Sequence, residues 1–304
     1  MAKEKKIMGL PRRELFSQGH RACAGCGAAI VARHTVKIAG SETIVVNATG
    51  CLEVFSTPYP QTAWKVPWIH GAFENAAAIA SGIDSSLIKQ GKRDKVNLIV
   101  MGGDGSTFDI GFGALSGAVE RGHKFTYICY DNEAYMNTGV QRSGATPKYA
   151  STTTSPAGKS IHGKQQFAKP MPMIMASHGA YVATANLAYL QDYQKKLQKA
   201  LAFDGPSYIQ IFSPCPTGWK HESDVTVTAA KLAFESKVTP LYEIENGVLT
   251  FTKKVNNAKP VREYLKTQKR FKHMSKQEIE EVQKHIEANY DKLLKIEESG
   301  ISCF

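Results

Sequence analysis

Short hydrophobic runs along the chain predict buried strands, and polar, glycine-rich loops follow several of them. The two clearest runs are residues 96–101 and 125–130, and further runs cover 43–46, 181–185 and 207–212. Continuous apolar runs of this length are typical of strands covered on both faces. Between them lie segments with a helical pattern, at residues 28–38, 72–83, 108–121, 187–203 and 227–237. The alternation predicts an α/β fold, a mostly parallel sheet with helices on both faces.

The two ends of the chain depart from this alternation. Residues 1–19 are polar and predict an N-terminal arm. Residues 241–304 predict a C-terminal extension with a strand pair near 242–252 and a helix over 276–297. The α/β domain is therefore expected to span residues 20–240.

Two internal segments lack a clear period. Residues 53–70 are rich in aromatic residues and proline, which predicts a packed, irregular loop with Phe55 and Trp64 in the core or at an interface. Residues 149–166 are rich in Ser, Thr, Gly and Lys and predict a long polar loop with a functional or interfacial role. The helix over 187–203 is expected to point three lysines outward: Lys195, Lys196 and Lys199.

The composition is that of an ordinary soluble protein. The chain has 304 residues, of which 42% are hydrophobic and 21% charged. No apolar run approaches the roughly 18–20 residues that cross a membrane. No apolar segment follows the N-terminal residues, so no signal peptide is expected. We therefore expect a cytoplasmic location.

The net charge is +11, and the distribution of the charged residues favours a protein-binding surface over a nucleic-acid groove. Lysines are spread along the chain and concentrate in its C-terminal third, where glutamates accompany them. A surface that contacts an acidic protein, or a solvated face, fits this mixture better than a phosphate-binding groove. Neither a DNA-recognition helix nor an RNA-binding signature is visible, so no nucleic-acid partner is expected.

Four of the six cysteines are placed to meet at one point. Cys23 and Cys26 form a C-x-x-C pair with Gly27 behind it, and Cys51 and Cys215 follow predicted strands. Without a secretory signal a disulfide framework is not expected. An iron–sulfur cluster and a Cys₄ zinc site both fit the four thiols. A thioredoxin-like redox pair is a third interpretation, but it leaves Gly27 and the third cysteine unexplained.

The remaining two cysteines have no such neighbours. Cys129 lies in the middle of a predicted strand and is expected to be a small buried hydrophobe. Cys303 lies near the C-terminus and has no partner that the sequence identifies.

Two of the loops that follow strands carry ligands for a metal ion. Asp104 stands between Gly103 and Gly105 after one strand, and Asn132 follows the next. Together with the main-chain carbonyl of Ala134, these are hard oxygen ligands suited to Mg²⁺ that carries a diphosphate. A Gly-Asp-Gly alone is a common turn, but with an asparagine at this spacing it matches the pattern that binds thiamine diphosphate.

These motifs together resemble the β subunits of the 2-oxoacid:ferredoxin oxidoreductase family, and the pyruvate members most of all. The resemblance covers roughly residues 18–275. The segments that carry it are Cys23-Ala-Gly-Cys26-Gly27, Asn47-Ala-Thr-Gly-Cys51, Gly103-Asp104-Gly105, Asn137-Thr138-Gly139 and Ala145-Thr146-Pro147.

The resemblance implies a thiamine-diphosphate-binding fold with one 4Fe-4S cluster beside the cofactor. It favours iron over zinc and assigns the cluster to Cys23, Cys26, Cys51 and Cys215. Asn137 matches a catalytic asparagine near the thiazolium ring and the substrate, and Thr138 matches a diphosphate contact. Further cofactor-binding residues are expected at Thr49, Gly50, Cys51, His70 and Tyr135.

The implied reaction is the reversible oxidative decarboxylation of pyruvate with coenzyme A, which gives acetyl-CoA and CO₂ and passes electrons to ferredoxin. Thiamine diphosphate serves as the electron sink when CO₂ leaves, and a nearby cluster takes up electrons one at a time.

The resemblance also implies that the chain works only with α, γ and δ partner subunits. The glutamate that activates thiamine is expected on the α chain, so Glu53, Glu74 and Glu133 are interpreted as structural. Arg142 is a candidate contact for coenzyme A or a subunit interface, and His70 a candidate polar contact near the cofactor.

Several functional alternatives stay open at this point. The substrate could instead be 2-oxoisovalerate, 2-oxoglutarate or oxalate, although residues 20–23 and 59–64 look most like the pyruvate members. An iron–sulfur electron-transfer subunit would need no Asp104 and Asn132 pair. A non-oxidative thiamine decarboxylase would need no set of four cysteines.

Overall fold

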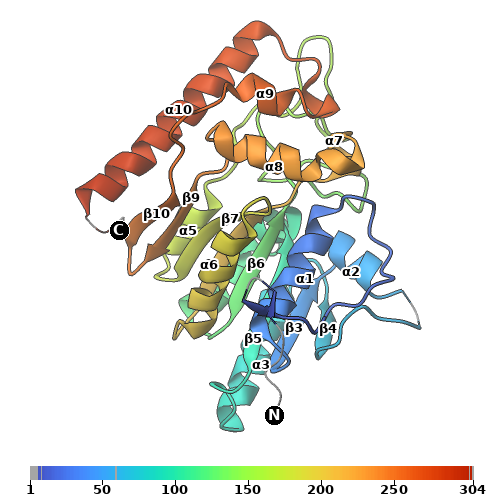
Figure 1. The fold of residues 1–304 in the computed structure, drawn as a ribbon, viewed down its shortest axis with the longest axis vertical. Coiled ribbons are helices and arrows are strands. Elements are labelled where there is room, and N and C mark those ends of the chain that lie inside the picture. Colours follow the sequence, from blue (N-terminus) through green and yellow to red (C-terminus); the bar gives the residue numbers. More distant parts are fainter. Residues whose placement is uncertain (1–5, 8, 59, 301, 303–304) are drawn as a thin grey trace.

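One eight-stranded sheet runs through the molecule in the order β10-β9-β7-β8-β6-β5-β3-β4 (Figure 1). The computed structural model describes residues 6–7, 9–58, 60–300 and 302. The strands from β4 to β7 in this order are all parallel, and β9 and β10 continue the sheet in antiparallel pairing. The expected α/β class with a mostly parallel sheet is confirmed.

The strands and helices have the following bounds. The strands are β1 Lys6–Ile7, β2 Leu10–Pro11, β3 Thr43–Ala48, β4 Trp68–Gly71, β5 Asn97–Gly103, β6 Thr126–Asp131, β7 Tyr181–Asn186, β8 Ser207–Phe212, β9 Leu241–Glu245 and β10 Val248–Lys253. The helices are α1 Gly27–Ala39, α2 Cys51–Ser56, α3 Ala76–Lys89, η1 Ser106–Ile110, α4 Phe112–Glu120, α5 Met171–Ala176, α6 Leu190–Ala202, α7 Pro216–Trp219, η2 Ser223–Val225, α8 Thr226–Glu235, α9 Val261–Leu265, η3 Lys269–Phe271 and α10 Lys276–Ser299. None of the described helices is long and apolar enough to cross a membrane.

Two hydrophobic cores cover the two faces of the sheet. Alternate residues of one strand enter different cores, since Val46 packs with α3, α4 and α5 whereas Val45 packs with α1, α2 and α6. Val100 and Ile99 of β5 divide in the same way. Both faces are therefore dry, which explains why these strands appear in the sequence as continuous apolar runs.

A third core joins the C-terminal segment to the carboxyl ends of the strands. It contains Phe212 at the end of β8, Trp219 of α7, Tyr264 of α9 and Phe271 of η3. Helices α7, α8 and α9 form a layer across that end of the sheet, and α10 runs along its side (Figure 1). Because β9 pairs with β7, the sheet also continues past the expected boundary at residue 240. The division into 1–19, 20–240 and 241–304 stays a prediction.

The expected strands are confirmed, and the errors concern short or interrupted elements. Residues 53–70 are not irregular throughout, because α2 extends into them and β4 pairs with β3 through backbone hydrogen bonds that leave no sequence pattern. Phe55 and Trp64 are buried in the core, as expected. The helix expected at 72–83 begins only at Ala76, since the Phe73 carbonyl accepts a hydrogen bond from Ser106 Oγ at 2.7 Å.

Lys196 is buried and does not face outward as expected. Its ammonium donates to Thr184 O at 2.8 Å and to Asp192 Oδ2 at 2.6 Å. A long lysine stem packs well against apolar neighbours when the charged end finds partners, so helical position alone does not decide its exposure.

The helix expected over 108–121 is split at Gly111 into a π-helical turn, η1, and the α-helix α4. A Cβ atom on Gly111 would lie 2.4 Å from Ser106 O and 3.2 Å from Glu74 O. A side chain at this position would therefore push apart η1, α4 and the segment before α3, whereas a Cβ on Gly113 would meet no atom within 4 Å.

We expect Gly111→Ala to lower the free energy of unfolding by about 1–3 kcal/mol, because the added methyl group has no room. The matched control Gly113→Ala lies exposed in the first turn of α4 and should leave the free energy of unfolding unchanged or raise it by up to about 0.5–1 kcal/mol through helix propensity. Urea denaturation of both variants measures the difference. Changes of the same sign and size in the two would contradict this account of the break.

Candidate cofactor site

Three oxygen atoms from the ends of β5 and β6 point at one another. Asp104 follows β5 and is fully buried, and Asn132 follows β6 and is 6% exposed. The two strands are parallel neighbours, so their carboxyl ends bring both side chains to the same edge. The third oxygen is the carbonyl of Ala134.

The distances between these atoms suit a hydrogen-bonded amide and also the spacing of ligands around a metal ion. The amide oxygen of Asn132 faces Asp104 Oδ1 and Ala134 O, and an amide nitrogen in its place would lie 3.0 and 2.9 Å from them. Without a cation the amide has to turn over so that its nitrogen donates to both. Octahedral Mg²⁺ holds oxygens at about 2.1 Å, which puts neighbouring ligands about 3 Å apart. The residues present therefore fit a magnesium ion.

The second oxygen of Asp104 is held from a different loop. Ser143 Oγ donates to Asp104 Oδ2, and Ser143 N donates to Thr146 Oγ1 at 2.9 Å. The buried ammonium of Lys164 donates to the carbonyls of Ser143, Gly144 and Thr146. Burial raises the pKa of Asp104 to about 7, so a bound cation would stabilise the charged form of this carboxylate.

A narrow pocket of about 20 Å³ opens beside this oxygen cluster. The expected cofactor-binding residues that line it are Thr49, Gly50, Cys51, Gly103, Gly105, Asn132, Ala134, Tyr135, Asn137 and Thr138. A Cβ on Gly50 would lie 3.0 Å from the Tyr130 hydroxyl, which is buried and has no hydrogen-bond partner among the described residues. The pocket thus keeps open space beside an unsatisfied polar atom, as a site for a polar ligand does.

The loops that form this pocket lie at the point where the sheet reverses its order. From β3 the chain moves outward to the edge strand β4, and from β5 it moves the other way to β6. Loops that leave neighbouring strands in opposite directions leave a crevice between them, where open α/β sheets bind ligands.

Cys23, Cys26, Cys51 and Cys215 line one cavity of about 240 Å³. Cys26 caps the start of α1, Cys51 opens α2, and Cys215 caps α7. Burial raises the pKa of the Cys26 thiol to about 11, and burial also raises that of Cys51 and Cys215. Repulsion from the other cysteines adds to each rise, so the four sulfurs are close enough to interact as thiolates.

Hydrogen-bond donors and a tight turn surround the cysteine sulfurs. Gly218 N donates to Cys215 Sγ at 3.3 Å, and Thr217 Oγ1 donates to Cys23 Sγ at 3.6 Å. Gly25 has a positive φ of 74°, and a Cβ there would lie 2.2 Å from Ser223 O. Only glycine fits this turn, which explains the glycine between Cys23 and Cys26.

The cysteine cavity and the narrow pocket adjoin. Cys51, Asn132 and Asn137 line both of them. Among the described residues, no group of three His, Cys, Asp or Glu side chains could hold a single metal ion. A 4Fe-4S cluster spreads its four thiolates over four irons, and the four sulfurs around one cavity with nearby N–H donors fit that group.

Some of the residues singled out in the sequence lie outside both pockets. His70 accepts or donates a hydrogen bond with Thr49 Oγ1 at 2.6 Å and is exposed. Arg142 is exposed, and its backbone N–H donates to Thr154 Oγ1 at 2.9 Å. Cys129 is fully buried in β6, as expected. Cys303 and Tyr59 lie outside the described residues.

The three glutamates considered as activators of thiamine also lie outside the narrow pocket among the described residues. Glu53 on α2 accepts a hydrogen bond from Thr57 Oγ1, and Glu74 is exposed. Glu133 is buried and forms an ion pair with Arg270.

Sequence analysis missed several residues that shape the site: Tyr130, Ser143, Lys164, Trp219 and Arg270. Only Trp219 carries a local signal, because it follows Cys215 closely and tryptophan is rarely placed in a short polar turn without a packing role. Tyr130 lies in β6 just before Asn132 but looks like any other apolar strand residue, whereas Ser143, Lys164 and Arg270 come from other segments, so nothing in the local pattern connects them with Asp104 or Asn132.

Residues 48–211 match the family model described as "Thiamine pyrophosphate enzyme, C-terminal TPP binding domain". The chain is 57% identical to the pyruvate synthase subunit PorB of Methanocaldococcus jannaschii, with 92% of this chain and 97% of the relative covered. It is 42% identical to the ketoisovalerate oxidoreductase subunit VorB of Pyrococcus abyssi, with 97% of each chain covered.

A solved structure shares the fold. It is a chain of the 2-oxoglutarate:ferredoxin oxidoreductase from Magnetococcus marinus with 2-oxoglutarate, coenzyme A and succinyl-CoA bound. The TM-score is 0.58 at 19% identity, and the match covers 92% of this chain and 99% of that one. The sequence relatives and the family model together show that the chain belongs to the thiamine diphosphate-dependent 2-oxoacid:ferredoxin oxidoreductase family.

Proposed function

We propose that this chain is the subunit that binds thiamine diphosphate and a 4Fe-4S cluster in a complex that oxidatively decarboxylates pyruvate. The complex would convert pyruvate and coenzyme A to acetyl-CoA and CO₂ reversibly and pass the electrons to ferredoxin. One observation carries the proposal: an oxygen cluster that fits Mg²⁺ and a cavity of four cysteines share the wall residues Cys51, Asn132 and Asn137.

In this proposal Asp104, Asn132 and the Ala134 carbonyl hold Mg²⁺ against the cofactor diphosphate. The diphosphate and ring contacts come from the remaining pocket residues: Thr49, Gly50, Cys51, Gly103, Gly105, Tyr135, Asn137 and Thr138, with His70 behind Thr49. Thiamine diphosphate, when bound, supplies a carbon nucleophile for the 2-oxo group and an electron sink for the loss of CO₂. Asn137, which lines both pockets, orients the substrate beside the cluster cavity.

Cys23, Cys26, Cys51 and Cys215 hold the cluster in this proposal. A 4Fe-4S cluster accepts one electron at a time at low potential. The N–H donor of Gly218 toward Cys215 and the hydroxyl of Thr217 toward Cys23 would tune that potential, because hydrogen bonds to the sulfurs stabilise the reduced, more negative cluster.

The proposal includes α, γ and δ partner subunits. The narrow pocket holds only about 20 Å³, and no glutamate among the described residues lines it, so a second chain would complete the site. The subunit names of the relatives and the coenzyme A in the solved structure support the multi-subunit enzyme and its co-substrate. Arg142 stays a candidate contact for coenzyme A or a partner. We place the complex in the cytoplasm.

We expect the anaerobically purified chain or complex to be brown, with about four iron and four sulfide per copy. Cys26→Ala should remove at least about half of the iron, because the cluster loses one of its four thiolates. The matched control is Cys129→Ala, a buried cysteine in β6 outside the cavity, which should keep the iron. A colourless wild-type protein that contains zinc would contradict the assignment of an iron–sulfur cluster.

Asp104→Asn should weaken the joint binding of Mg²⁺ and thiamine diphosphate by on the order of 100-fold, because the cation loses its only charged ligand from this chain. The measurement is isothermal titration of the cofactor-free complex. Asp84→Asn is the control, since Asp84 is also a buried carboxylate but lies on α3 and pairs with Arg93 and His123. It should lower the melting temperature and leave cofactor affinity unchanged, and equal affinity losses would contradict the assignment.

Pyruvate should give the highest kcat/KM when the purified complex is assayed with coenzyme A and a viologen dye. The comparison substrates are 2-oxoisovalerate, 2-oxoglutarate and oxalate, of which 2-oxoisovalerate is the closest rival because one relative is a ketoisovalerate oxidoreductase subunit. An advantage of about tenfold or more corresponds to about 1.4 kcal/mol of discrimination. No measurable preference for pyruvate would overturn the substrate assignment while leaving the reaction class in place.

A further inference from the structure

Glu133 stands between two of the three oxygen ligands, and its backbone is in the left-handed region. Its φ is +65°, which residues with a Cβ rarely adopt. This turn sends the Asn132 side chain and the Ala134 carbonyl to the same side, toward Asp104. A strained residue between two ligands needs contacts that hold it there.

Three contacts hold Glu133 in this conformation. Its N–H donates to Asp131 Oδ1 at 3.0 Å, and its carbonyl accepts from Thr146 Oγ1 at 2.7 Å. Its carboxylate forms a buried ion pair with Arg270. The first two fix the backbone from the end of β6 and from the loop that carries Thr146, whereas the third reaches it from the C-terminal segment.

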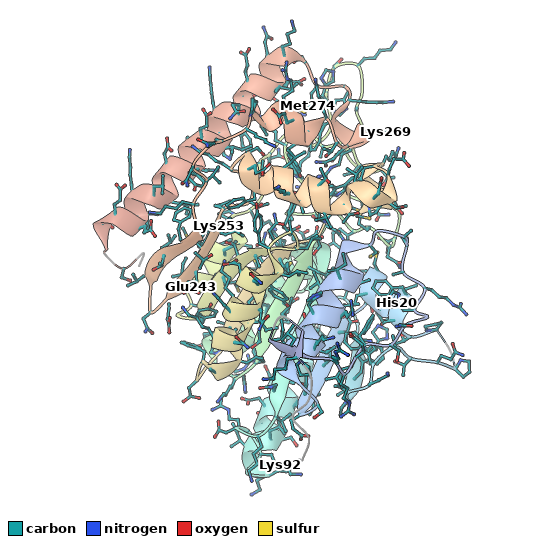
Figure 2. The ribbon with its side chains drawn as sticks, viewed as in Figure 1. His20, Lys92, Glu243, Lys253, Lys269 and Met274 are labelled. Atoms are coloured by element: carbon teal, nitrogen blue, oxygen red, sulfur yellow. The ribbon has the colours of Figure 1, made fainter. Side chains whose placement is uncertain are left out.

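Arg270 is itself held in a fixed position. It is 5% exposed, its Nε donates to Gln268 Oε1 at 2.7 Å, and its carbonyl accepts from Ser151 N at 3.0 Å. The guanidinium carbon lies 4.0 Å from the ring centre of Trp219. Its neighbour Lys269 lies on the outside of the layer that covers the carboxyl end of the sheet (Figure 2).

Trp219 connects Arg270 to the loop of Asn132 and Ala134 by a second set of contacts. Its indole N–H donates to Asn132 O at 2.8 Å. One guanidinium therefore contacts both the side chain of Glu133 and the ring that holds the backbone of Asn132. Because Trp219 ends α7, which starts beside Cys215, this ring also joins the cysteine cavity to the metal loop.

The ion pair also keeps Glu133 away from the metal. Asp104, Asp131 and Glu133 are three buried carboxylates near one another. Glu133 freed from Arg270 would be a buried anion beside two metal ligands and would compete for the cation. Paired with Arg270, it leaves the cation to Asp104, Asn132 and Ala134.

We propose that Arg270 is a positioning residue for the metal site, which through Glu133 and Trp219 holds Asn132 and Ala134 in place to bind the cation with Asp104. The inference rests on the proposed function, since it concerns the cation assigned there. It gives the C-terminal segment a direct part in cofactor binding, beyond covering the end of the sheet.

The test measures Mn²⁺ binding to the purified complex after its metal is removed and excess thiamine diphosphate is added. Binding is detected by electron paramagnetic resonance as a decrease in the signal of free Mn²⁺. Arg270→Met should raise the Mn²⁺ dissociation constant by about tenfold or more, as removal of outer-shell partners of metal ligands does. Trp219→Phe keeps the ring but loses the N–H and should raise it by a smaller factor. Lys196→Met is the matched control, because it too breaks an ion pair between a buried cation and a carboxylate but lies on α6. It should lower the melting temperature and leave the dissociation constant unchanged.

The outcomes separate the two proposals. No Mn²⁺ binding by the wild-type complex would overturn the proposed metal site, and the inference with it. Tight binding by the wild type and an unchanged dissociation constant in Arg270→Met would overturn the inference alone. Should Arg270→Met fail to fold, Arg270→Gln, which removes the cation but keeps a polar side chain, takes its place, and an unchanged dissociation constant in that variant has the same meaning. If Lys196→Met lowered the Mn²⁺ affinity as much as Arg270→Met, the effect would be one of general stability, and the inference would also be overturned.

Discussion

The site depends on negative charge that is buried at the carboxyl ends of β5 and β6. The carboxylate of Asp104 lies beside the Asn132 amide and the Ala134 carbonyl, and two further carboxylates, Asp131 and Glu133, are buried nearby. Such an arrangement is costly unless cations or donors compensate it. The chain supplies Arg270, the ammonium of Lys164 and the hydroxyl of Ser143 around the cluster, and in the proposed function a divalent cation compensates the charge at its centre.

Much of the surrounding fold can be understood as support for this cluster. The parallel pairing of β5 with β6 brings Asp104 and Asn132 to one edge, and dry cores on both faces fix the strands. The third core, under α8 and α9, places Trp219 and Arg270 over the metal-ligand loop. The same α7 that ends in Trp219 begins at Cys215, so the cysteine cavity and the oxygen cluster share one rigid wall. A cofactor and an electron acceptor need such closeness to exchange electrons quickly.

Membership in the 2-oxoacid:ferredoxin oxidoreductase family agrees with these features and divides the functional problem. The chain holds the groups that would bind a cofactor and a cluster, whereas the described residues around the narrow pocket include no glutamate. The relatives carry the names of both pyruvate and ketoisovalerate enzymes at high identity.

The sequence by itself determined the parallel sheet, the loops that carry Asp104 and Asn132, and the four cysteines, because these features are local: apolar runs mark strands, and glycines and ligands follow them directly. Its errors were short elements and exposure, such as β4, the break at Gly111 and buried Lys196, where backbone pairing or close packing overrides local preference. Only the tertiary structure decided which carboxylates are neutralised and by what. Arg270 meets Glu133, and Ser143 meets Asp104, across long stretches of chain, and no local pattern encodes which distant side chain arrives at a buried charge.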